Sequence, residues 1–236
     1  MKSKFYNDKQ NEEVIHKLMV KHWLYKLLEK KGFKFFEEVD NRFEQKLWID
    51  FKCIFDWNIV NIDEKTRFTI PLYENKIKYT FALEISNSSS KKIGWFIDKN
   101  KMTDYYLLNY PILDKEIWKN NRNYKINYDW SIEWIVNNVN WVVSQLVSVE
   151  KLRKYFSNRI DKQDLVNFIK SFYTENINRG WIEYYNLKFQ KIKKTDRWDI
   201  YFTYNNFLKE RPINLIVNQK VYDKIREFEL YIHFKK

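Results

Sequence analysis

Residues 47–68, with the sequence LWIDFKCIFDWNIVNIDEKTRF, contain two stretches in which apolar and polar residues alternate. Alternation with a period of two is typical of β-strands that bury one face. The dipeptide Trp57-Asn58 lies between the stretches and could form a two-residue turn. We therefore predict that residues 47–55 and 59–68 form an antiparallel hairpin that packs one face against the core. The residues expected on this apolar face are Ile49, Phe51, Cys53, Val60 and Ile62.

The other face of the predicted hairpin carries charged side chains. In the register set by that turn, Asp50 lies opposite Lys65, and Lys52 lies opposite Asp63. Because side chains alternate along a strand, all four share one face. We expect this polar face to lie outside the core.

Two carboxylates and a lysine in this arrangement could act on a phosphodiester. Neighbouring strands are about 4.8 Å apart, so Asp50 and Asp63 could both reach one Mg²⁺ or Mn²⁺ ion. Such an ion neutralises charge on a phosphate and acidifies a bound water. Lys65 could orient or deprotonate that water, or stabilise the pentavalent state. Cross-strand pairs of Asp and Lys are also common on solvated sheet faces, so the spacing leaves both interpretations open.

A helix is predicted before the hairpin and further strands after it. Apolar residues recur at helical spacing between Asn11 and Lys31, and Gly32 suits a left-handed cap at the end of that helix. Pro111 is expected to end the last strand of the first half. The other strands predicted in that half span residues 33–39, 78–86, 93–98 and 105–110. In the second half we predict helices at 150–156, 162–173 and 221–228, and strands at 181–189, 198–204 and 213–217.

Composition excludes several classes of site. The chain has 236 residues, with 43 Lys and Arg against 31 Asp and Glu, so its net charge is +12. A general bias towards lysine could account for part of that charge, which is therefore only mild support for a nucleic-acid partner. Three glycines cannot form the usual nucleotide-binding loops. The lone Cys53 excludes a disulfide framework and a cysteine-rich zinc site, and its simplest role is a small core residue.

The order of the acidic and basic residues resembles the PD-(D/E)xK nuclease superfamily. Asp50 matches its first acid, and Asp63-Glu64-Lys65 matches its second motif, whereas Ile49 stands where the motif has proline. The likeness spans roughly residues 10–112 and is to uncharacterised bacterial and phage members. The ordered blocks that carry it are Trp48-Ile49-Asp50, Ile62-Asp63-Glu64-Lys65, Phe81-Ala82-Leu83-Glu84-Ile85-Ser86, Gly94-Trp95-Phe96-Ile97-Asp98 and Lys101-Met102-Thr103-Asp104-Tyr105-Tyr106.

This resemblance implies an α/β fold with a mixed central sheet flanked by helices, a restriction-endonuclease-like core. We expect the core in residues 1–114, and residues 115–236 as a C-terminal α+β region packed on it. The activity implied is that of a deoxyribonuclease dependent on Mg²⁺ or Mn²⁺. The site residues implied are Asp50, Asp63 and Glu84 as metal ligands, with Lys65 as the fourth catalytic residue.

Other interpretations of the acids and lysines stay open. Glu84 could instead be a solvated or ion-paired carboxylate near a strand end. Glu12 and Glu13 could approach the metal from the first helix, or could simply favour the positive end of its dipole. The lysines around residues 91–101 could follow phosphates or be ordinary solvated side chains. His16 and His22 are expected to be packing or surface residues of the first helix.

The first expectation is therefore a metal-dependent DNA endonuclease. The alternatives are a nucleic-acid-binding protein on the same fold with weak or lost catalysis, and an interaction protein whose hairpin face is solvated. DNA is the expected partner, and a homodimer stays open because cutting both strands needs two sites. No apolar run reaches about 18 residues, and residues 1–10 lack an apolar core, so we expect a cytoplasmic protein without a membrane partner.

Overall fold

The computed structural model describes residues 4–21, 23–39, 49–66, 80–86, 98, 100–113, 139–174, 182–193, 200–205 and 212–234. Their helices and strands follow in the order α1 (Lys4–Lys21), α2 (Leu24–Glu29), β1 (Lys34–Glu38), β2 (Phe51–Phe55), β3 (Asn58–Thr66), β4 (Thr80–Ser86), β5 (Tyr105–Leu113), β6 (Val139–Ser148), α6 (Val149–Ser157), α7 (Lys162–Thr174), β7 (Ile182–Tyr185), β8 (Lys191–Ile192), β9 (Ile200–Asn205), β10 (Ile213–Asn218), α8 (Gln219–Ile225) and β11 (Arg226–His233).

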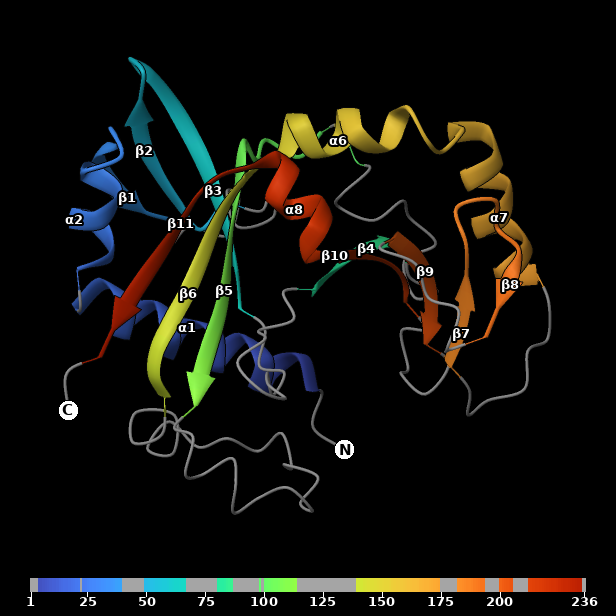
Figure 1. Cartoon of the computed structure of the whole chain (residues 1–236), viewed down its shortest axis with the longest axis horizontal. Helices are drawn as coiled ribbons and strands as arrows, with labels where there is room; N and C mark the ends of the chain where they lie inside the picture. Colours follow the sequence, from blue (N-terminus) through green and yellow to red (C-terminus); the bar gives the residue numbers. More distant parts are fainter. Residues whose placement is uncertain are drawn as a thin grey trace.

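The strands form two sheets (Figure 1). The first has the order β1-β2-β3-β5-β6-β11, in which β3 and β5 are parallel and all other neighbours are antiparallel. The second has the order β4-β10-β9-β7-β8 and is antiparallel. The predicted α/β class and the mixed sheet are therefore confirmed.

Both halves of the chain contribute to both sheets. Strands β6 and β11 from the second half complete the first sheet, whereas β4 from the first half pairs with β10 in the second sheet. The predicted boundary between residues 114 and 115 falls between β5 and β6, which pair along their whole length.

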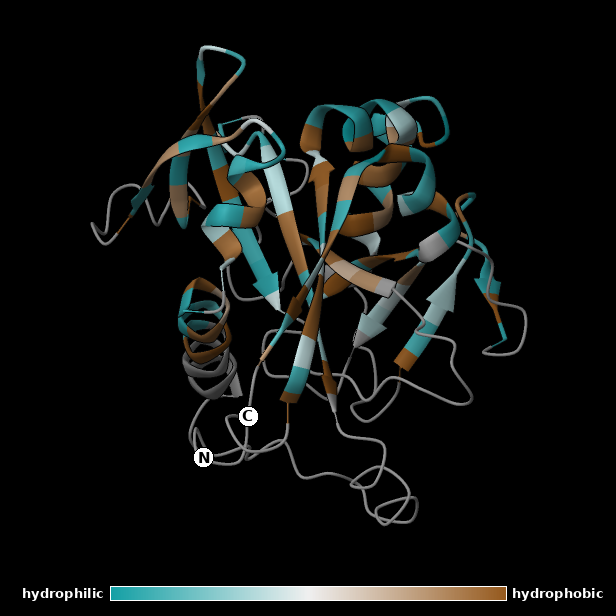
Figure 2. Cartoon of the chain, turned by 60° about the vertical axis from the view of Figure 1, so that its left-hand side comes forward, coloured by the Kyte–Doolittle hydropathy of each residue, from teal (hydrophilic) through white to brown (hydrophobic). Residues whose placement is uncertain are grey.

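Helices α1 and α2 cover one face of the first sheet. Three residues of the apolar rows that predict this helical region, Ile15, Met19 and Leu28, are fully buried, as is Leu24. Trp23, which belongs to the same rows, is instead 60% exposed. The buried residues pack against apolar side chains of β2, β3, β5, β6 and β11. Figure 2 shows long apolar segments along the central strands, whereas the hairpin that projects from the sheet has a hydrophilic tip.

The opposite face of the first sheet is covered by the second sheet and by α6 and α8, whereas α7 packs against the second sheet through Phe168. Tyr106, Leu108, Val143 and Val147 point from the first sheet into this second core. Leu83 and Phe202 from the second sheet, with buried residues of the three helices, complete it. Neither face of the first sheet is therefore left to solvent along its centre.

The predicted hairpin is present, with a different turn. Strands β2 and β3 are antiparallel, and Ile49, Phe51, Cys53, Val60 and Ile62 are buried as expected. The turn is Asp56-Trp57, because Phe55 pairs with Asn58 and Lys52 pairs with Asn61. Asp50, which immediately precedes β2, is therefore placed beside Asp63 and not opposite Lys65. Both turn residues have positive φ, 47° at Asp56 and 64° at Trp57, as a type I′ turn requires.

Glycine in place of Trp57 is expected to stabilise the protein by roughly 0.5–1 kcal/mol. The tryptophan side chain is 95% exposed, so little packing is lost, whereas glycine adopts φ of 64° without a steric penalty. Urea unfolding should show this gain. The Trp57→Ala variant is the matched control, because alanine retains the Cβ and with it the strain. Equal stability of the glycine and alanine variants would contradict the turn.

The single predicted helix over residues 11–31 is instead two helices. They are separated at Trp23, which has a left-handed φ of 84°. Gly32 has φ of 94° and its N–H donates to the carbonyl oxygen of Glu29 (2.9 Å), so the predicted cap is confirmed.

Pro111 does not end β5, contrary to the prediction. Pairing with β3 stops at Asn109, so Pro111 lies where β6 is the one described neighbour, and its missing N–H is tolerated there.

Candidate functional site

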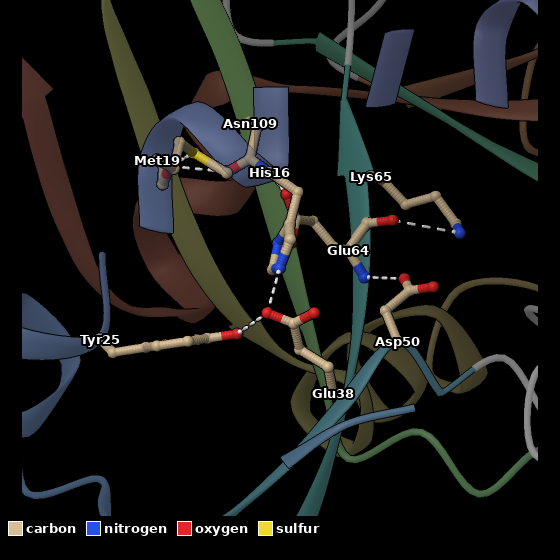
Figure 3. Close-up of polar contacts among 9 residues, drawn as sticks. His16, Met19, Tyr25, Glu38, Asp50, Glu64, Lys65 and Asn109 are labelled. Atoms are coloured by element: carbon tan, nitrogen blue, oxygen red, sulfur yellow. Dashed lines mark hydrogen bonds and ion pairs between the residues drawn. The ribbon is translucent and has the colours of Figure 1, made fainter. Parts of the chain in front are cut away.

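Asp50, Asp63 and Lys65 meet on the face of β3 that points away from α1. The Nζ atom of Lys65 lies 2.6 Å from Oδ1 of Asp63. Oδ2 of Asp50 accepts a hydrogen bond of 2.6 Å from the main-chain N–H of Glu64, and Lys65 Nζ also donates to the main-chain oxygen of Glu64 at 3.3 Å. Figure 3 shows Asp50 and Lys65 on the same side of the strand. The sequence-based grouping of these three residues is therefore reproduced.

The environment of these residues differs from the solvated polar face that the sequence predicts. The side chain of Asp63 is 1% exposed and that of Lys65 is 16% exposed. Their partners across the parallel pair with β5 are Tyr106 and Leu108, which belong to the second core. The second layer of the fold covers this face, so Asp63 is a core residue.

Burial dominates the electrostatics of this cluster. Removal from water raises the pKa of Asp63 well above its usual range, the charge of Lys65 opposes that rise, and the charge of Asp50 adds to it. Two carboxylates so close together repel unless a cation or a proton lies between them. Lys65 supplies one cation, but it bonds Oδ1 of Asp63.

Among the described residues, no donor reaches the remaining oxygen, Oδ2 of Asp63, which is buried. A hydrogen bond with Asp50, which requires a proton on one of the two carboxyl groups, contributes to the raised pKa of Asp63. A buried carboxylate oxygen without a donor is costly, and a divalent cation bound there would remove that cost. Carboxylate oxygens are the ligands that Mg²⁺ and Mn²⁺ prefer, and Mg²⁺ is usually held by one or two protein carboxylates together with phosphates and water. The residues of the cluster therefore fit such an ion.

Glu84, the predicted third acid, lies in β4 of the second sheet. It is half-buried, and its cross-strand partner is Asn214 of β10. In the described parts of the chain, no three His, Cys, Asp or Glu side chains form a group that could hold a metal ion. The structure thus brings Asp50 and Asp63 together and does not add Glu84 to them as a third ligand.

The other acids and lysines considered from the sequence are not part of this cluster. Glu13 is exposed and forms an ion pair with Lys17 on the same helix, 2.6 Å away. The side chain of Glu12, His22 and the lysines at 91, 92 and 99 lie outside the described residues. Cys53 is buried, as predicted for a small core residue.

No family model, curated protein or solved structure matches the chain. Among the described helices, none is long and apolar enough to cross a membrane.

Arg153 of α6 is a cation near Tyr106, the cross-strand partner of Asp63, and the sequence does not reveal it. Burial and the charge of Asp63 raise the pKa of Tyr106 well above its usual value, and the charge of Arg153 opposes that rise. Arg153 is half-buried and its Nη2 donates to the main-chain oxygen of Asp98 (3.0 Å). Arginine and Lys65 together could contact the oxygens of a phosphate.

A second polar group lies on the other face of β3, under α1. Nδ1 of His16 lies 2.6 Å from Oε2 of Glu64, and Nδ2 of Asn109 donates to Oε1 of Glu64 at 2.7 Å. The Oγ atom of Ser144 donates to Oδ1 of Asn109 at 2.6 Å. On the outer side, Nε2 of His16 lies 3.3 Å from Oε1 of Glu38 (Figure 3). These contacts join α1, β1, β3, β5 and β6.

The His16–Glu64 pair holds a proton at neutral pH. Burial alone would lower the pKa of His16, but Glu64 and Glu38 outweigh it and raise the pKa to about 9. Burial raises the pKa of Glu64, and the positive charge of His16 opposes that rise. A protonated His16 therefore donates to both glutamates.

The sequence predicts His16 only as a packing or surface residue, although it contains a signal for the pair with Glu64. Alternation along β3 puts Glu64 on the same face as Val60 and Ile62, which is the buried face. A charged residue at such a position needs a buried partner. His16 in the apolar rows of the first helix is a suitable one.

Proposed function

We propose that this protein is a metal-dependent endonuclease that hydrolyses phosphodiester bonds of DNA. The observation that carries the proposal is the meeting of Asp50, Asp63 and Lys65 on adjacent strands, with Oδ2 of Asp63 buried and lacking a hydrogen-bond donor among the described residues. The resemblance of these residues to the PD-(D/E)xK pattern supports the same activity. The mixed sheet with a helix packed on β2 and β3 is compatible with a restriction-endonuclease-like core.

Each residue has a role in this proposal. Asp50 and Asp63 would hold Mg²⁺ or Mn²⁺, and the bound ion would neutralise charge on the scissile phosphate and acidify water. Lys65 places its ammonium beside Asp63, where it could stabilise the additional negative charge of the pentavalent phosphate. Glu84 has no role here, because no three acids among the described residues form a group that could hold a metal ion. Arg153 is a candidate for a second phosphate contact, because its charge acts on Tyr106, the cross-strand partner of Asp63.

Supercoiled plasmid DNA tests the activity directly. We expect the purified protein to convert it to nicked or linear forms in Mg²⁺ or Mn²⁺, and to leave it intact in EDTA, because both carboxylates need the ion to accept a phosphate beside them. Gel electrophoresis at two salt concentrations measures the conversion. Plasmid that stays supercoiled in both metals at either salt concentration would contradict the proposed activity.

A nucleic-acid-binding protein without catalysis is the second candidate. The specific observation in its favour is that Lys65 already neutralises Asp63 at 2.6 Å, in a site where no third carboxylate from the described part of the chain joins the pair. Binding to DNA that weakens with salt, without cleavage in either metal, would support this candidate over the first.

A further inference from the structure

Glu64 connects the two faces of β3. Its main-chain N–H donates to Asp50 (2.6 Å) and its main-chain oxygen accepts from Lys65 (3.3 Å). Its carboxylate points the other way, towards α1, and is 6% exposed. One residue therefore carries the main-chain contacts of the candidate site on one face and a buried ion pair on the other.

Both oxygens of that carboxylate are bonded, and by different elements. His16 of α1 bonds Oε2 at 2.6 Å, and Asn109 of β5 bonds Oε1 at 2.7 Å. Asn109 is in turn held by Ser144 of β6 at 2.6 Å, and Oγ of Ser144 lies 3.6 Å from the sulfur of Met19 in α1. The carboxylate can satisfy these partners in one position of β3 relative to α1 and β5.

Stability alone does not account for a charged pair at this position. An apolar side chain would continue the row of Val60 and Ile62, and replacing a buried ion pair by apolar residues often leaves a protein as stable or more stable. Hydrogen-bonded charges instead define one arrangement, because any displacement leaves a buried charge unpaired.

We propose that His16 is a positioning residue: through Glu64 it fixes the main chain of β3 that orients Asp50 and Lys65. That Asp50 and Lys65 form a catalytic site rests on the proposed nuclease function. The effect of His16 on the main chain of β3 does not depend on that function. Helix α1 would then support the candidate site from the opposite face of the first sheet.

Amide hydrogen exchange of the metal-free protein provides the first test. His16→Ala should speed exchange of the Glu64 N–H by about tenfold or more, while protected amides of β11 at the far edge of the sheet change little. Lys17→Ala is the matched control, because Lys17 is a neighbour on α1 whose side chain is 72% exposed. A merely structural role of His16 would speed all protected amides alike, and that result would overturn the proposal.

Binding of Mn²⁺, without DNA, provides the second test. His16→Ala should weaken Mn²⁺ binding by about tenfold or more, and Lys17→Ala should leave it unchanged. Reversible unfolding also raises the apparent dissociation constant, by the inverse of the folded fraction. The constant is therefore compared under conditions in which circular dichroism shows both variants to be folded, and any remaining difference reports positioning. If His16→Ala does not fold, Glu64→Gln keeps the side-chain volume and takes its place in both measurements.

The outcomes separate this proposal from the proposed function. Wild-type Mn²⁺ affinity together with wild-type protection of the Glu64 N–H in the variant would overturn the positioning role, even if the protein cuts DNA. A wild-type protein that neither binds Mn²⁺ nor cuts DNA would contradict the nuclease function. In that case, faster exchange of the Glu64 N–H alone in His16→Ala would still show that His16 positions the main chain of β3.

Discussion

Asparagine in place of Asp63 is expected to abolish Mg²⁺-dependent cleavage of plasmid DNA without lowering the melting temperature. An amide oxygen is a weaker ligand for Mg²⁺ than a carboxylate, and a loss of about 4 kcal/mol of transition-state stabilisation slows cleavage by about 10³. Stability should hold or rise because burial disfavours the charged form of Asp63, as its raised pKa indicates. Plasmid nicking and thermal unfolding measure the two effects.

Two further variants serve as controls for this experiment. Asp56→Asn makes the same chemical change at an exposed turn residue, so it should leave cleavage intact. Lys65→Met should also stop turnover, but Mn²⁺ binding should persist because an ammonium offers no lone pair to a metal. Cleavage by Asp63→Asn at the wild-type rate would place the active site elsewhere. A large fall in its melting temperature would show that the ion pair with Lys65 outweighs the cost of burying Asp63.

The sequence predicted the faces of the central hairpin better than its register. Moving the turn by one residue, from Trp57-Asn58 to Asp56-Trp57, shifts the pairing of the strands by two residues. A shift of two keeps every side chain on its face, because the period of a strand is also two. The grouping of Asp50 with Asp63 therefore survived the wrong turn, although the predicted opposition of Asp50 and Lys65 did not.

Contacts between distant parts of the chain were outside the reach of local patterns. Residues 221–228 were predicted as one helix, whereas α8 ends at Ile225 and β11 begins at Arg226. Strand β11 exists because it pairs with β6, which is far away in the sequence. For the same reason the burial of Asp63 was missed, since the layer that covers it comes from the second half of the chain and from β4.

The stability of the protein is expected to fall by about 3 kcal/mol as the pH rises from 6.5 to 9, because His16 loses its proton over this range. The pKa of His16 rises from 6.5 to about 9 on folding, so the folded state binds the proton more tightly. The resulting stabilisation is complete below pH 6.5 and is lost as the pH passes through about 9. Urea unfolding at several pH values measures it.

The charged and titratable groups around His16 leave the loss of its proton as the main cause of the fall in stability between pH 6.5 and 9. Glu64 and Glu38 face the ring from β3 and β1, and both favour the protonated form of His16. Tyr25 of α2 donates to Glu38 (3.0 Å), and its pKa is raised, so it stays protonated in this range. Lys17, on the same helix, stays charged because Glu13 raises its pKa.

Glu64→Gln should therefore remove most of this fall in stability, because the carboxylate that holds the proton on His16 is gone. His233→Gln is the matched control, since it removes an exposed histidine of β11 and leaves the pair intact; its stability should fall with pH as in the wild type. If the Glu64→Gln variant loses stability as steeply as the wild type, His16 does not carry a shared proton, and α1 is held on the sheet by its apolar contacts alone. A flat profile in the wild type would lead to the same conclusion.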